Sequence, residues 1–498
     1  LLGTEQKYVC VSRPRRFGKS MAANMLSAYY DKSEDSGALF QNLSISHCPS
    51  FKEHLNRYDV IKINMQDFLS STHTMTEMLA KLSKYLIYDL LEQYKQVRFC
   101  DETDLIQVMK DVFVYTKQPF IILIDEWDCL FREYKENKEA QKQYLDFLRV
   151  WLKDKSYVAL AYMTGILPIK KYGEHSALNM FDEYSMTNQR ELAEFTGFTE
   201  QEVQELCPAY DMPYEKMKQW YDGYDLKGIQ IYNPRSVVMS LLGHDFDSYW
   251  TKTETYEALK KYIQMDMYNL KELVTKLIAG SSVAINPDKF QNDMTTFASA
   301  DDVLTLLVHL GYLTYDFDTR TVHIPNQEVQ KEFINCIEDG GWEPVMDAIR
   351  KSEELLNATI SGDEDTVAKI IEHVHQENTS ILAYNDENSL ACVISLAYYS
   401  AKKNYVIYRE LAGGKGFADL VFIPRKTTQT PAIVVELKWN QTADAAIDQI
   451  KRKEYVQSLK DYRGEVLLVG INYESKDSDG ENYKKHFCKI ERMTIAPV

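Results

Sequence analysis

The chain has 498 residues, of which 45% are hydrophobic, and at ~150 residues per domain this length predicts about three domains with cores of their own. The net charge of −17 repels phosphate groups, so unspecific binding to nucleic acids is disfavoured and any surface for DNA or RNA has to be local. The eight cysteines include no close pair and no run approaches the ~20 apolar residues of a membrane span, so we expect a soluble cytoplasmic protein without disulfides, zinc or a membrane partner.

A phosphate-binding loop is indicated close to the first residue. Residues 8–12 read as an apolar strand, residues 13–20 spell Arg-Pro-Arg-Arg-Phe-Gly-Lys-Ser, and residues 21–30 favour a helix. In a loop of this kind, backbone N–H groups and the helix N-terminus face the anion. Lys19 is then placed to reach the terminal phosphates of ATP, and Ser20 to bind Mg²⁺.

The loop departs from the usual phosphate-binding pattern in one place. That pattern has glycine five positions before Gly18, and this chain has Arg13 there. We nevertheless predict that Arg16, Gly18, Lys19 and Ser20 contact the nucleotide, with Ser20 also a ligand of the metal. For Arg16, a solvated loop position explains the sequence equally well.

A second strand supplies the acids that such a site needs. Residues 120–126 are five apolar residues followed by Asp125 and Glu126, which is the pattern of a buried parallel strand with two carboxylates at its C-terminal edge. We predict that Asp125 binds the metal and that Glu126 is a catalytic residue acting on the attacking water. A strand-end turn or a helix cap is the alternative for both acids. A further strand, at residues 158–164, ends in Thr164, where many ATPases keep a sensor for the nucleotide.

These strands belong to a predicted α/β domain over residues 1–198. Apolar strands alternate there with amphipathic helices, which is typical of a parallel sheet flanked by helices. The strands are expected at residues 8–12, 60–64, 120–124 and 158–164. An N-terminal P-loop sheet is therefore the expected fold of this part.

The middle of the chain, residues 199–340, is expected to be mostly helical. Residues 199–202 form a capping box that opens the first helix. Towards the end of this region, a helix, a hairpin and a second helix indicate a winged-helix-like lid. These elements are expected at residues 304–309, 312–315, 322–324 and after the capping residue Asn326. The aromatic turn at residues 220–224 is expected to pack against the lid, with a ligand contact as the alternative.

Two charges, Glu436 and Lys438, lie on one face of the otherwise apolar strand expected at residues 432–438. A neighbouring strand, expected at residues 416–423, contains Asp419. Two carboxylates can hold a hard divalent cation such as Mg²⁺ or Mn²⁺, which polarises a phosphate and lowers the pKa of a bound water. We therefore predict Asp419, Glu436 and Lys438 as catalytic residues of a metal-dependent phosphodiesterase. An ordinary ion pair between Glu436 and Lys438 is the alternative.

This Asp and Glu-x-Lys arrangement resembles the PD-(D/E)xK nuclease superfamily. The resemblance implies that Glu387, on the helix that opens the nuclease core, supports the metal held by the two other acids. It also implies supporting roles for Gln449 and Tyr455, on a helix expected over residues 440–455. A nuclease-like α/β core is thus expected over residues 341–498. Two helices are expected to lead into it, at residues 342–357 and 363–377.

Taken together, the motifs are similar to bacterial AAA-ATPase-like proteins that carry a PD-(D/E)xK domain at the C-terminus. The segments that carry this resemblance are residues 13–20, 124–128 (Ile-Asp-Glu-Trp-Asp), 164–169 (Thr-Gly-Ile-Leu-Pro-Ile), 220–224 (Trp-Tyr-Asp-Gly-Tyr), 232–234 (Tyr-Asn-Pro), 311–314 and 325–329. They run through nearly the whole chain and imply ATP and Mg²⁺ as ligands. The family also implies a segment ahead of Leu1, which often serves adenine recognition.

A local basic cluster is the best candidate for a DNA or RNA surface. Its members are Lys451, Arg452, Lys453, Lys460 and Arg463, close in sequence to the predicted nuclease site. A helix with solvated charges would look the same, so both interpretations stay open. The oligomeric state also stays open, with a homo-oligomer among the alternatives.

Two functions fit these predictions. In the first, the N-terminal module binds and hydrolyses ATP with Mg²⁺, and its nucleotide state controls a nuclease that cleaves DNA or RNA with Mg²⁺ or Mn²⁺. In the second, the protein is a signalling ATPase switch whose nuclease-like domain binds nucleic acid or a protein partner without cutting it. The retained Asp, Glu and Lys favour the first function. The acidic net charge favours the second.

Overall fold

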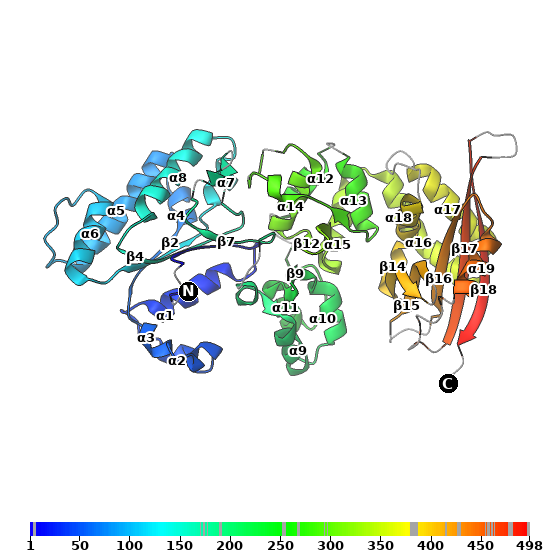
Figure 1. Cartoon of the computed structure of the whole chain (residues 1–498), viewed down its shortest axis with the longest axis horizontal. Coiled ribbons are helices and arrows are strands. Elements are labelled where there is room, and N and C mark those ends of the chain that lie inside the picture. The colour runs from blue at the N-terminus through cyan, green and yellow to red at the C-terminus, as the bar shows by residue number, and fades with distance from the viewer. Residues whose placement is uncertain are drawn as a thin grey trace. The chain divides into compact units, whose positions relative to one another are not determined.

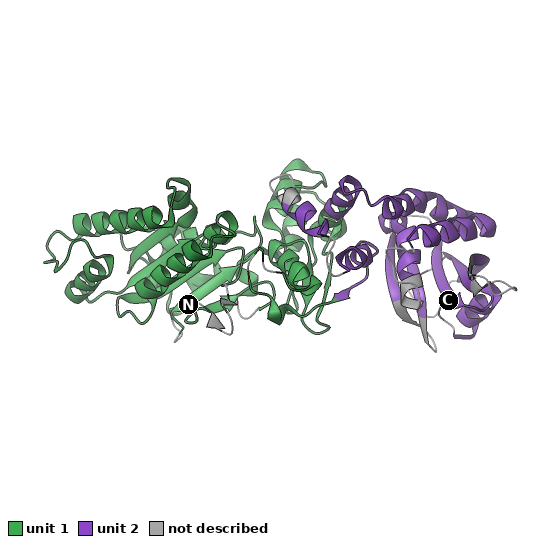
Figure 2. Ribbon diagram, turned by 90° about the horizontal axis from the view of Figure 1, so that it is seen from above, with its two compact units in different colours: residues 1–256, 284–331 green, residues 257–283, 332–498 purple. Residues whose placement is uncertain are grey.

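The structure is a computed structural model of the chain, and it divides into two compact units (Figure 2). The first unit comprises Leu1–Tyr256 and Ala284–Lys331, and the second comprises Glu257–Val283 and Glu332–Val498. The structure describes residues 1–2, 6–169, 171–172, 175–176, 178–188, 192–250, 255–265, 269–292, 294–295, 297–378, 387–413, 416–425, 430–453, 455, 459, 462, 464–476 and 482–495. The division into three domains at residues 198 and 340 stays a prediction.

The first unit contains a five-stranded parallel sheet in the order β2-β3-β4-β1-β7. Figure 1 labels β2, β4 and β7 of this sheet, with helices packed around it. Its strands are β1 (Tyr8–Ser12), β2 (Asp59–Asn64), β3 (Phe120–Asp125), β4 (Val158–Gly165) and β7 (Asp182–Tyr184). Every residue of β3 is buried, because the strand is apolar up to its last residue and lies between β2 and β4. The four strands predicted here and their parallel arrangement are confirmed.

Helices pack on this sheet and on one another. Helix α1 (Lys19–Tyr30) contacts β2, β3 and β4, and its Tyr29 joins Val11 and Leu123 in one apolar core. The longer helices α5 (Met75–Gln93), α6 (Leu105–Thr116) and α8 (Lys138–Leu152) have side-chain N-caps from Thr74, Asp104 and Asn137. Shorter elements are α2 (Gly37–Phe40), η1 (Ser44–His47), α3 (Phe51–His54), α4 (Met65–Ser70), α7 (Cys129–Glu133), β5 (Lys171–Tyr172), β6 (His175–Ser176) and η2 (Ala193–Phe195).

The predicted capping box opens the helical part of the first unit. The Glu202 N–H donates to Thr199 Oγ1 at 3.3 Å, and the Thr199 N–H donates to Glu202 Oε2 at 2.8 Å, which starts α9 (Glu200–Ala209). Helices α10 (Tyr214–Tyr221) and α11 (Pro234–Gly243) follow. Strands β8 (Phe198–Thr199), β9 (Tyr224–Leu226) and β10 (Ile229–Tyr232) form a small sheet in the order β8-β10-β9.

The helix, hairpin and helix predicted for the lid are present. They are α14 (Ala300–Leu310), β12 (Thr314–Asp316), β13 (Thr321–His323) and α15 (Gln327–Asp339), with β11 (Val283–Ala284) and η3 (Pro287–Lys289) beside them. The first strand begins at Thr314 and not at Tyr312, as predicted. The reason is that the N–H groups of Tyr312 and Leu313 bond to Leu307 O, so these residues close the end of α14.

The aromatic turn at residues 220–224 packs against this lid. Tyr224 Oη donates to Gly311 O, just after α14, at 2.7 Å. Gly223 has φ +101°, and a Cβ added there would lie 2.1 Å from Pro325 O, so only glycine fits this approach of two backbones. The contacts agree with the packing role that the sequence favoured for the turn.

The second unit contains a mixed five-stranded sheet in the order β14-β15-β16-β17-β18. Its strands are β14 (Tyr405–Gly413), β15 (Gly416–Pro424), β16 (Ala432–Trp439), β17 (Gly464–Lys476) and β18 (Asn482–Ile495). Neighbours are antiparallel except β16 and β17, which run parallel and are joined across α19 (Ala443–Lys453). Ile447 and Ile450 of α19 pack on Val434 and Leu468 of these two strands.

Helix α19 is shorter than the predicted helix over residues 440–455. It begins after Thr442, whose Oγ1 accepts from the Ala445 N–H at 3.1 Å, and it ends before Tyr455. Besides α15, which belongs to this unit from Glu332 on, the helices wholly or mostly in it are α12 (Thr255–Ile263), α13 (Leu270–Ile278), α16 (Glu343–Ser361), α17 (Glu364–Asn378), α18 (Glu387–Ala397) and η4 (Tyr399–Lys403). Helices α16 and α17 match the two predicted to lead into the nuclease-like core.

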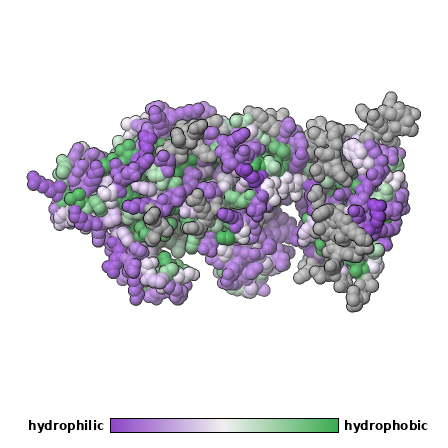
Figure 3. Space-filling model, in the orientation of Figure 1, coloured by the Kyte–Doolittle hydropathy of each residue, from purple (hydrophilic) through white to green (hydrophobic). Residues whose placement is uncertain are grey.

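On the face drawn in Figure 3, hydrophilic side chains predominate and apolar ones are scattered. Across the described parts of the chain, no helix has both the length and the apolar character that a membrane span needs. The cytoplasmic location stays a prediction.

Candidate functional site

The predicted phosphate-binding loop leads directly into α1, whose first residue is Lys19. Two loop residues have left-handed backbones, Arg16 with φ +69° and Gly18 with φ +84°. Gly18 is the N-cap of α1, and nothing lies within 4 Å of a Cβ added there, so glycine is favoured by its backbone angle and not by crowding. Arg16 and Ser20 are exposed on either side of it. The first-turn N–H groups of α1 and the positive end of its dipole thus follow the loop, as anion binding requires.

Arg13 takes the place of the usual glycine and is fully buried. Its Nη1 donates to Ser12 O at 3.0 Å and to Tyr184 O, on the edge strand β7, at 2.9 Å. Its backbone N–H donates to Gly165 O, at the end of β4, at 3.1 Å. Burial lowers the pKa of Arg13 to about 10, and the nearby Tyr162 partly offsets this effect. The arginine ties the start of the loop to two strands, which explains how the loop accommodates a long side chain here.

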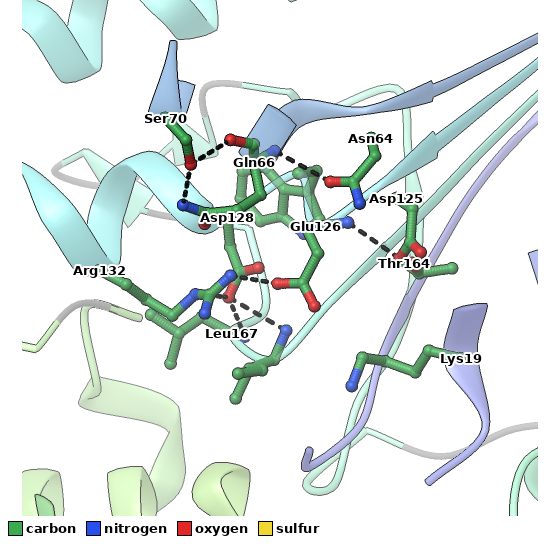
Figure 4. Close-up of polar contacts among 12 residues, drawn as sticks. Lys19, Asn64, Gln66, Ser70, Asp125, Glu126, Asp128, Arg132, Thr164 and Leu167 are labelled. Carbon is green, nitrogen blue, oxygen red and sulfur yellow. Dashed lines mark hydrogen bonds and ion pairs between the residues drawn. The ribbon is translucent and has the colours of Figure 1, made fainter. Parts of the chain in front are cut away.

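Lys19 is buried, and its Nζ donates to Pro14 O of the same loop at 2.8 Å. Burial lowers the pKa of Lys19 to about 8, because desolvation disfavours the ammonium ion. The charges of Glu126, Asp128 and Asp125 act in the opposite direction. The lysine therefore lies close to the acids at the end of β3 and just after it (Figure 4), while its hydrogen-bond partner is a neutral carbonyl.

Asp125 is the last residue of β3 and lies at the C-terminal edge of the sheet, beside Asn64 of β2. Its Oδ1 accepts hydrogen bonds from Thr164 Oγ1, on β4, and from the Glu126 N–H at 2.9 Å. Thr164 is fully buried, so its hydroxyl fixes the orientation of the carboxylate. The predicted sensor residue thus contacts the predicted metal ligand directly.

Glu126 is held by an arginine that the sequence analysis did not single out. Its Oε2 accepts a hydrogen bond from Arg132 Nη2, on α7 (Figure 4). The Nε of the same arginine lies 3.7 Å from Asp128 Oδ2. Asp128 is fully buried, and its Oδ2 also accepts from the N–H groups of Ile166 at 3.0 Å and Leu167 at 2.9 Å.

A sequence signal for this arginine exists. Asp128 and Arg132 are four residues apart, a spacing that places two side chains on the same face of a helix. Their pairing with Glu126 depends on the turn between β3 and α7, where Glu126 has a left-handed backbone with φ +53°. That conformation is uncommon for a residue other than glycine, and no residue pattern predicts it.

The second group of predicted residues lies on β15 and β16. The register of these strands pairs Leu420 with Val435, so Asp419 and Glu436 are the next residues along each strand. Asp419 Oδ2 accepts from the Leu437 N–H at 2.7 Å. Glu436 is buried, with a side chain 2% exposed, and its Oε1 accepts from Lys438 Nζ at 2.9 Å. The structure thus brings the three predicted catalytic residues together.

The supporting residues predicted from the resemblance also reach this group. Gln449 Nε2, on α19, donates to Glu436 Oε1 and, at 3.2 Å, to Tyr455 Oη. Burial raises the pKa of Tyr455, and the charges of Glu436 and Asp419 raise it further, so both carboxylates lie near the phenol. Glu387 is the first residue of α18, but its side chain lies outside the described residues.

The structure tests the metal ligands and the basic cluster only in part. In the described portions, no three His, Cys, Asp or Glu side chains are grouped as ligands would be, and the side chain of Glu387, the predicted third acid, lies outside these portions. Of the basic cluster, Lys460 and Arg463 lie outside the described residues. Lys451 forms an ion pair with Glu491 at 2.6 Å, Arg452 is exposed, and Lys453 is half-buried.

Comparison with known proteins separates the two ends of the chain. Residues 1–173 match a family described as "Predicted AAA-ATPase", and this range contains the loop, Asp125, Glu126 and Thr164. Residues 385–480 match the "PD-(D/E)XK nuclease superfamily", and this range contains Asp419, Glu436 and Lys438. Both resemblances recognised in the sequence are thereby confirmed.

Two individual proteins are also similar to this chain. An "Uncharacterized protein in vnfD 5'region" of Azotobacter chroococcum mcd 1 is 24% identical over 258 residues, which are 49% of this chain and 47% of the relative. The chain thus spans about half the length of that relative. The solved structure of the Aeropyrum pernix ORC1 protein in complex with DNA is 10% identical, with coverage of 92% of this chain and 89% of that one, but its TM-score of 0.21 supports no conclusion. The chain carries a predicted AAA-ATPase-like domain at its N-terminus and a PD-(D/E)XK nuclease superfamily domain towards its C-terminus.

Proposed function

We propose that the N-terminal domain binds ATP with Mg²⁺ and hydrolyses it, and that its nucleotide state controls a metal-dependent nuclease in the C-terminal domain. The ATPase part of the proposal is supported by one observation: Lys19 lies near Asp125 and Glu126 at the C-terminal edge of one parallel sheet. Ligands of open α/β sheets bind at such edges. The family match over residues 1–173 supports the same assignment.

In this proposal each residue of the N-terminal site has a separate task. Lys19 leaves Pro14 O for the terminal phosphates, and the N–H groups around Gly18, with the Arg16 side chain, hold the remaining phosphate oxygens. Ser20 and Asp125 supply hard oxygen donors that fit Mg²⁺, which when bound neutralises phosphate charge. Thr164 keeps the Asp125 carboxylate in place.

Glu126 completes the chemistry by orienting the attacking water. The water oxygen forms a bond to the γ-phosphorus while the bond from this phosphorus to the bridging oxygen breaks, and ADP leaves. The proton lost by the water passes to the Glu126 carboxylate and then to the released phosphate. Hydrolysis therefore needs a Glu126 carboxylate that is free to accept a proton from water.

The nuclease part of the proposal rests on the C-terminal site. Asp419 and Glu436 are hard oxygen donors suited to Mg²⁺ or Mn²⁺, with Glu387 as a further ligand. When bound, the metal polarises the phosphodiester and lowers the pKa of a water. Lys438 then stabilises the developing phosphate charge, while Gln449 and Tyr455 orient Glu436. DNA or RNA is the substrate, approached through Lys451, Arg452 and Lys453.

A second candidate function is a signalling ATPase switch whose nuclease-like domain binds nucleic acid or protein without cleavage. The ion pair between Lys438 and Glu436 favours it, because both charges are satisfied without a metal. The pairing of Lys451 with Glu491 and the net charge of −17 point the same way.

Incubation of the purified chain with plasmid, linear DNA and RNA separates the two functions. Reactions contain Mg²⁺ or Mn²⁺, with and without ATP, and products are resolved on gels. We expect metal-dependent cleavage whose rate changes with ATP. Glu436→Gln is the inactive control, and Glu343→Gln, which changes an exposed acid that pairs with Arg350 on α16, is the matched control with normal cleavage. Binding without cleavage under every condition would establish the switch instead.

A further inference from the structure

Arg132 lies between two acids that differ in how firmly they are held. Its side chain is only 13% exposed and bonds to Glu126 Oε2 through Nη2, while its Nε faces Asp128 Oδ2 at 3.7 Å. Burial alone would lower the pKa of Arg132, but the charges of Asp128 and Glu126 together raise it. The guanidinium is therefore a permanent cation shared by two carboxylates.

Asp128 is the fixed partner of this arginine. Its side chain is fully buried, and its Oδ2 accepts from the N–H groups of Ile166 and Leu167, which follow β4. These two backbone bonds hold the carboxylate in place whether or not Arg132 is paired with anything else. A buried cation next to a fixed buried anion stays compensated.

Glu126 is the partner that can leave. Its side chain is 27% exposed, so a freed carboxylate has access to water. Its left-handed backbone, with φ +53°, costs free energy in a residue other than glycine, and such strain is typical of functional positions that have to change. Loss of the Glu126 contact leaves Arg132 beside Asp128, so no unpaired cation remains buried.

We propose that Arg132 is a positioning residue that holds Glu126 in a resting state, so that ATP hydrolysis begins only when Glu126 leaves the guanidinium. This inference rests on the proposed ATPase function and concerns how that activity is restrained. A carboxylate oxygen that accepts from a guanidinium is less able to accept a proton from water. Asp128 serves as the anchor that keeps Arg132 in place in both states.

The test is the rate of ATP hydrolysis by the full chain carrying Arg132→Gln. The variant is expected to raise kcat about fivefold, because the free energy of one partly exposed ion pair no longer restrains Glu126, while Kd for ATP is unchanged. Arg132→Lys, which keeps a cation but loses the planar fork, is expected to give an intermediate kcat. The double variant Glu126→Gln/Arg132→Gln is expected to be inactive, since the gain acts through Glu126.

Two controls separate restraint from a structural role. Arg149→Gln removes an exposed arginine paired with Asp146 on α8 and is expected to leave kcat and the melting temperature unchanged. Asp128→Asn/Arg132→Gln removes the buried charge that Arg132→Gln would leave unpaired, and the Asn oxygen still accepts from Ile166 and Leu167. If Arg132→Gln destabilises the chain, this double variant has to show the raised kcat.

The possible outcomes distinguish a failure of this inference from a failure of the proposed ATPase function on which it rests. A kcat that is unchanged or lower in Arg132→Gln, with normal ATP binding, overturns the restraint alone. Parallel loss of kcat and melting temperature in all Arg132 variants also overturns it, because the arginine is then structural. If neither the wild type nor any Arg132 variant binds or hydrolyses ATP, the proposed ATPase function itself is wrong.

Discussion

The two candidate sites each hold a carboxylate against a cation, but they build the pair differently. At the C-terminal site, Glu436 pairs with Lys438, two residues away on the same strand. At the N-terminal site, Glu126 pairs with Arg132, which comes from the next helix and is shared with Asp128. The first pair consists of two charges on the same strand, whereas the second is part of a group of three charges.

This difference determines whether the cation of each pair keeps an acidic partner when the glutamate is removed. Removal of Glu436 leaves Lys438, 12% exposed, without the one ion-pair partner recorded for it in the described part of the chain. Removal of Glu126 leaves Arg132 with the anchored Asp128. We infer that Glu126 is free to exchange partners during a reaction cycle, whereas Glu436 exchanges Lys438 only for another cation, such as a metal.

The largest expected effect is on activity when each acid is neutralised. Glu126→Gln is expected to lower the rate of ATP hydrolysis about 1000-fold with ATP binding retained, because the water loses its orienting carboxylate. Glu436→Gln is expected to abolish nucleic acid cleavage and leave ATP hydrolysis normal. Phosphate release and gel-based cleavage assays on both variants measure this. Loss of ATP hydrolysis in Glu436→Gln, or cleavage that survives in this variant, contradicts the assignment of the two activities to two separate sites.

Next in size is the effect of Lys19→Ala on ATP binding. The substitution removes the cation expected at the terminal phosphates, so Kd for ATP should rise about 100-fold. Calorimetry measures this, with the exposed Lys95→Ala as control. An unchanged Kd would show that Lys19, bonded to Pro14 O, is only a loop stabiliser.

Much of the fold was predictable because local pattern decides it. The apolar runs of β1, β3 and β4 are continuous, and the capping box at Thr199 sets the start of α9. Boundaries were less predictable where a side chain competes with the expected element. Thr442 starts α19 three residues later than predicted, and Tyr312 closes α14 and does not begin β12.

The residues of the candidate sites also differ in how well the sequence predicts them. Glu436 and Lys438 are recognisable because alternate residues of one strand share a face. Arg132 was missed because its contact with Glu126 depends on a left-handed turn, which brings together groups from a strand and a helix. The burial of Arg13 could not be predicted either, since its partner Tyr184 is on a distant edge strand.

A smaller effect is expected on stability without metal, and it tests the comparison directly. Glu436→Gln should lower the free energy of unfolding by about 2 kcal/mol, because it leaves the nearly buried Lys438 without its acidic partner. Glu126→Gln should change it by less than about 0.5 kcal/mol, because Arg132 keeps Asp128. Urea unfolding measures both, and Glu491→Gln, at an exposed ion pair, is the control. Equal losses of unfolding free energy in the two variants would contradict the distinction between a pair of two charges and a cation shared by two acids.

The smallest expected effect is the uptake of less than one proton when ATP binds at alkaline pH. In the free protein, burial lowers the pKa of Lys19 to about 8, so at pH 9 much of the Lys19 population is neutral. Phosphate oxygens favour the ammonium and raise this pKa, so binding at pH 9 takes up a proton from the buffer. At pH 7 the lysine is already charged, and no uptake at Lys19 is expected.

Calorimetry in two buffers with different ionisation enthalpies measures the uptake, and Lys19→Arg, whose guanidinium stays charged, should show none. Equal uptake by Lys19→Arg and the wild type would mean that another group takes the proton and that Lys19 does not face the phosphates.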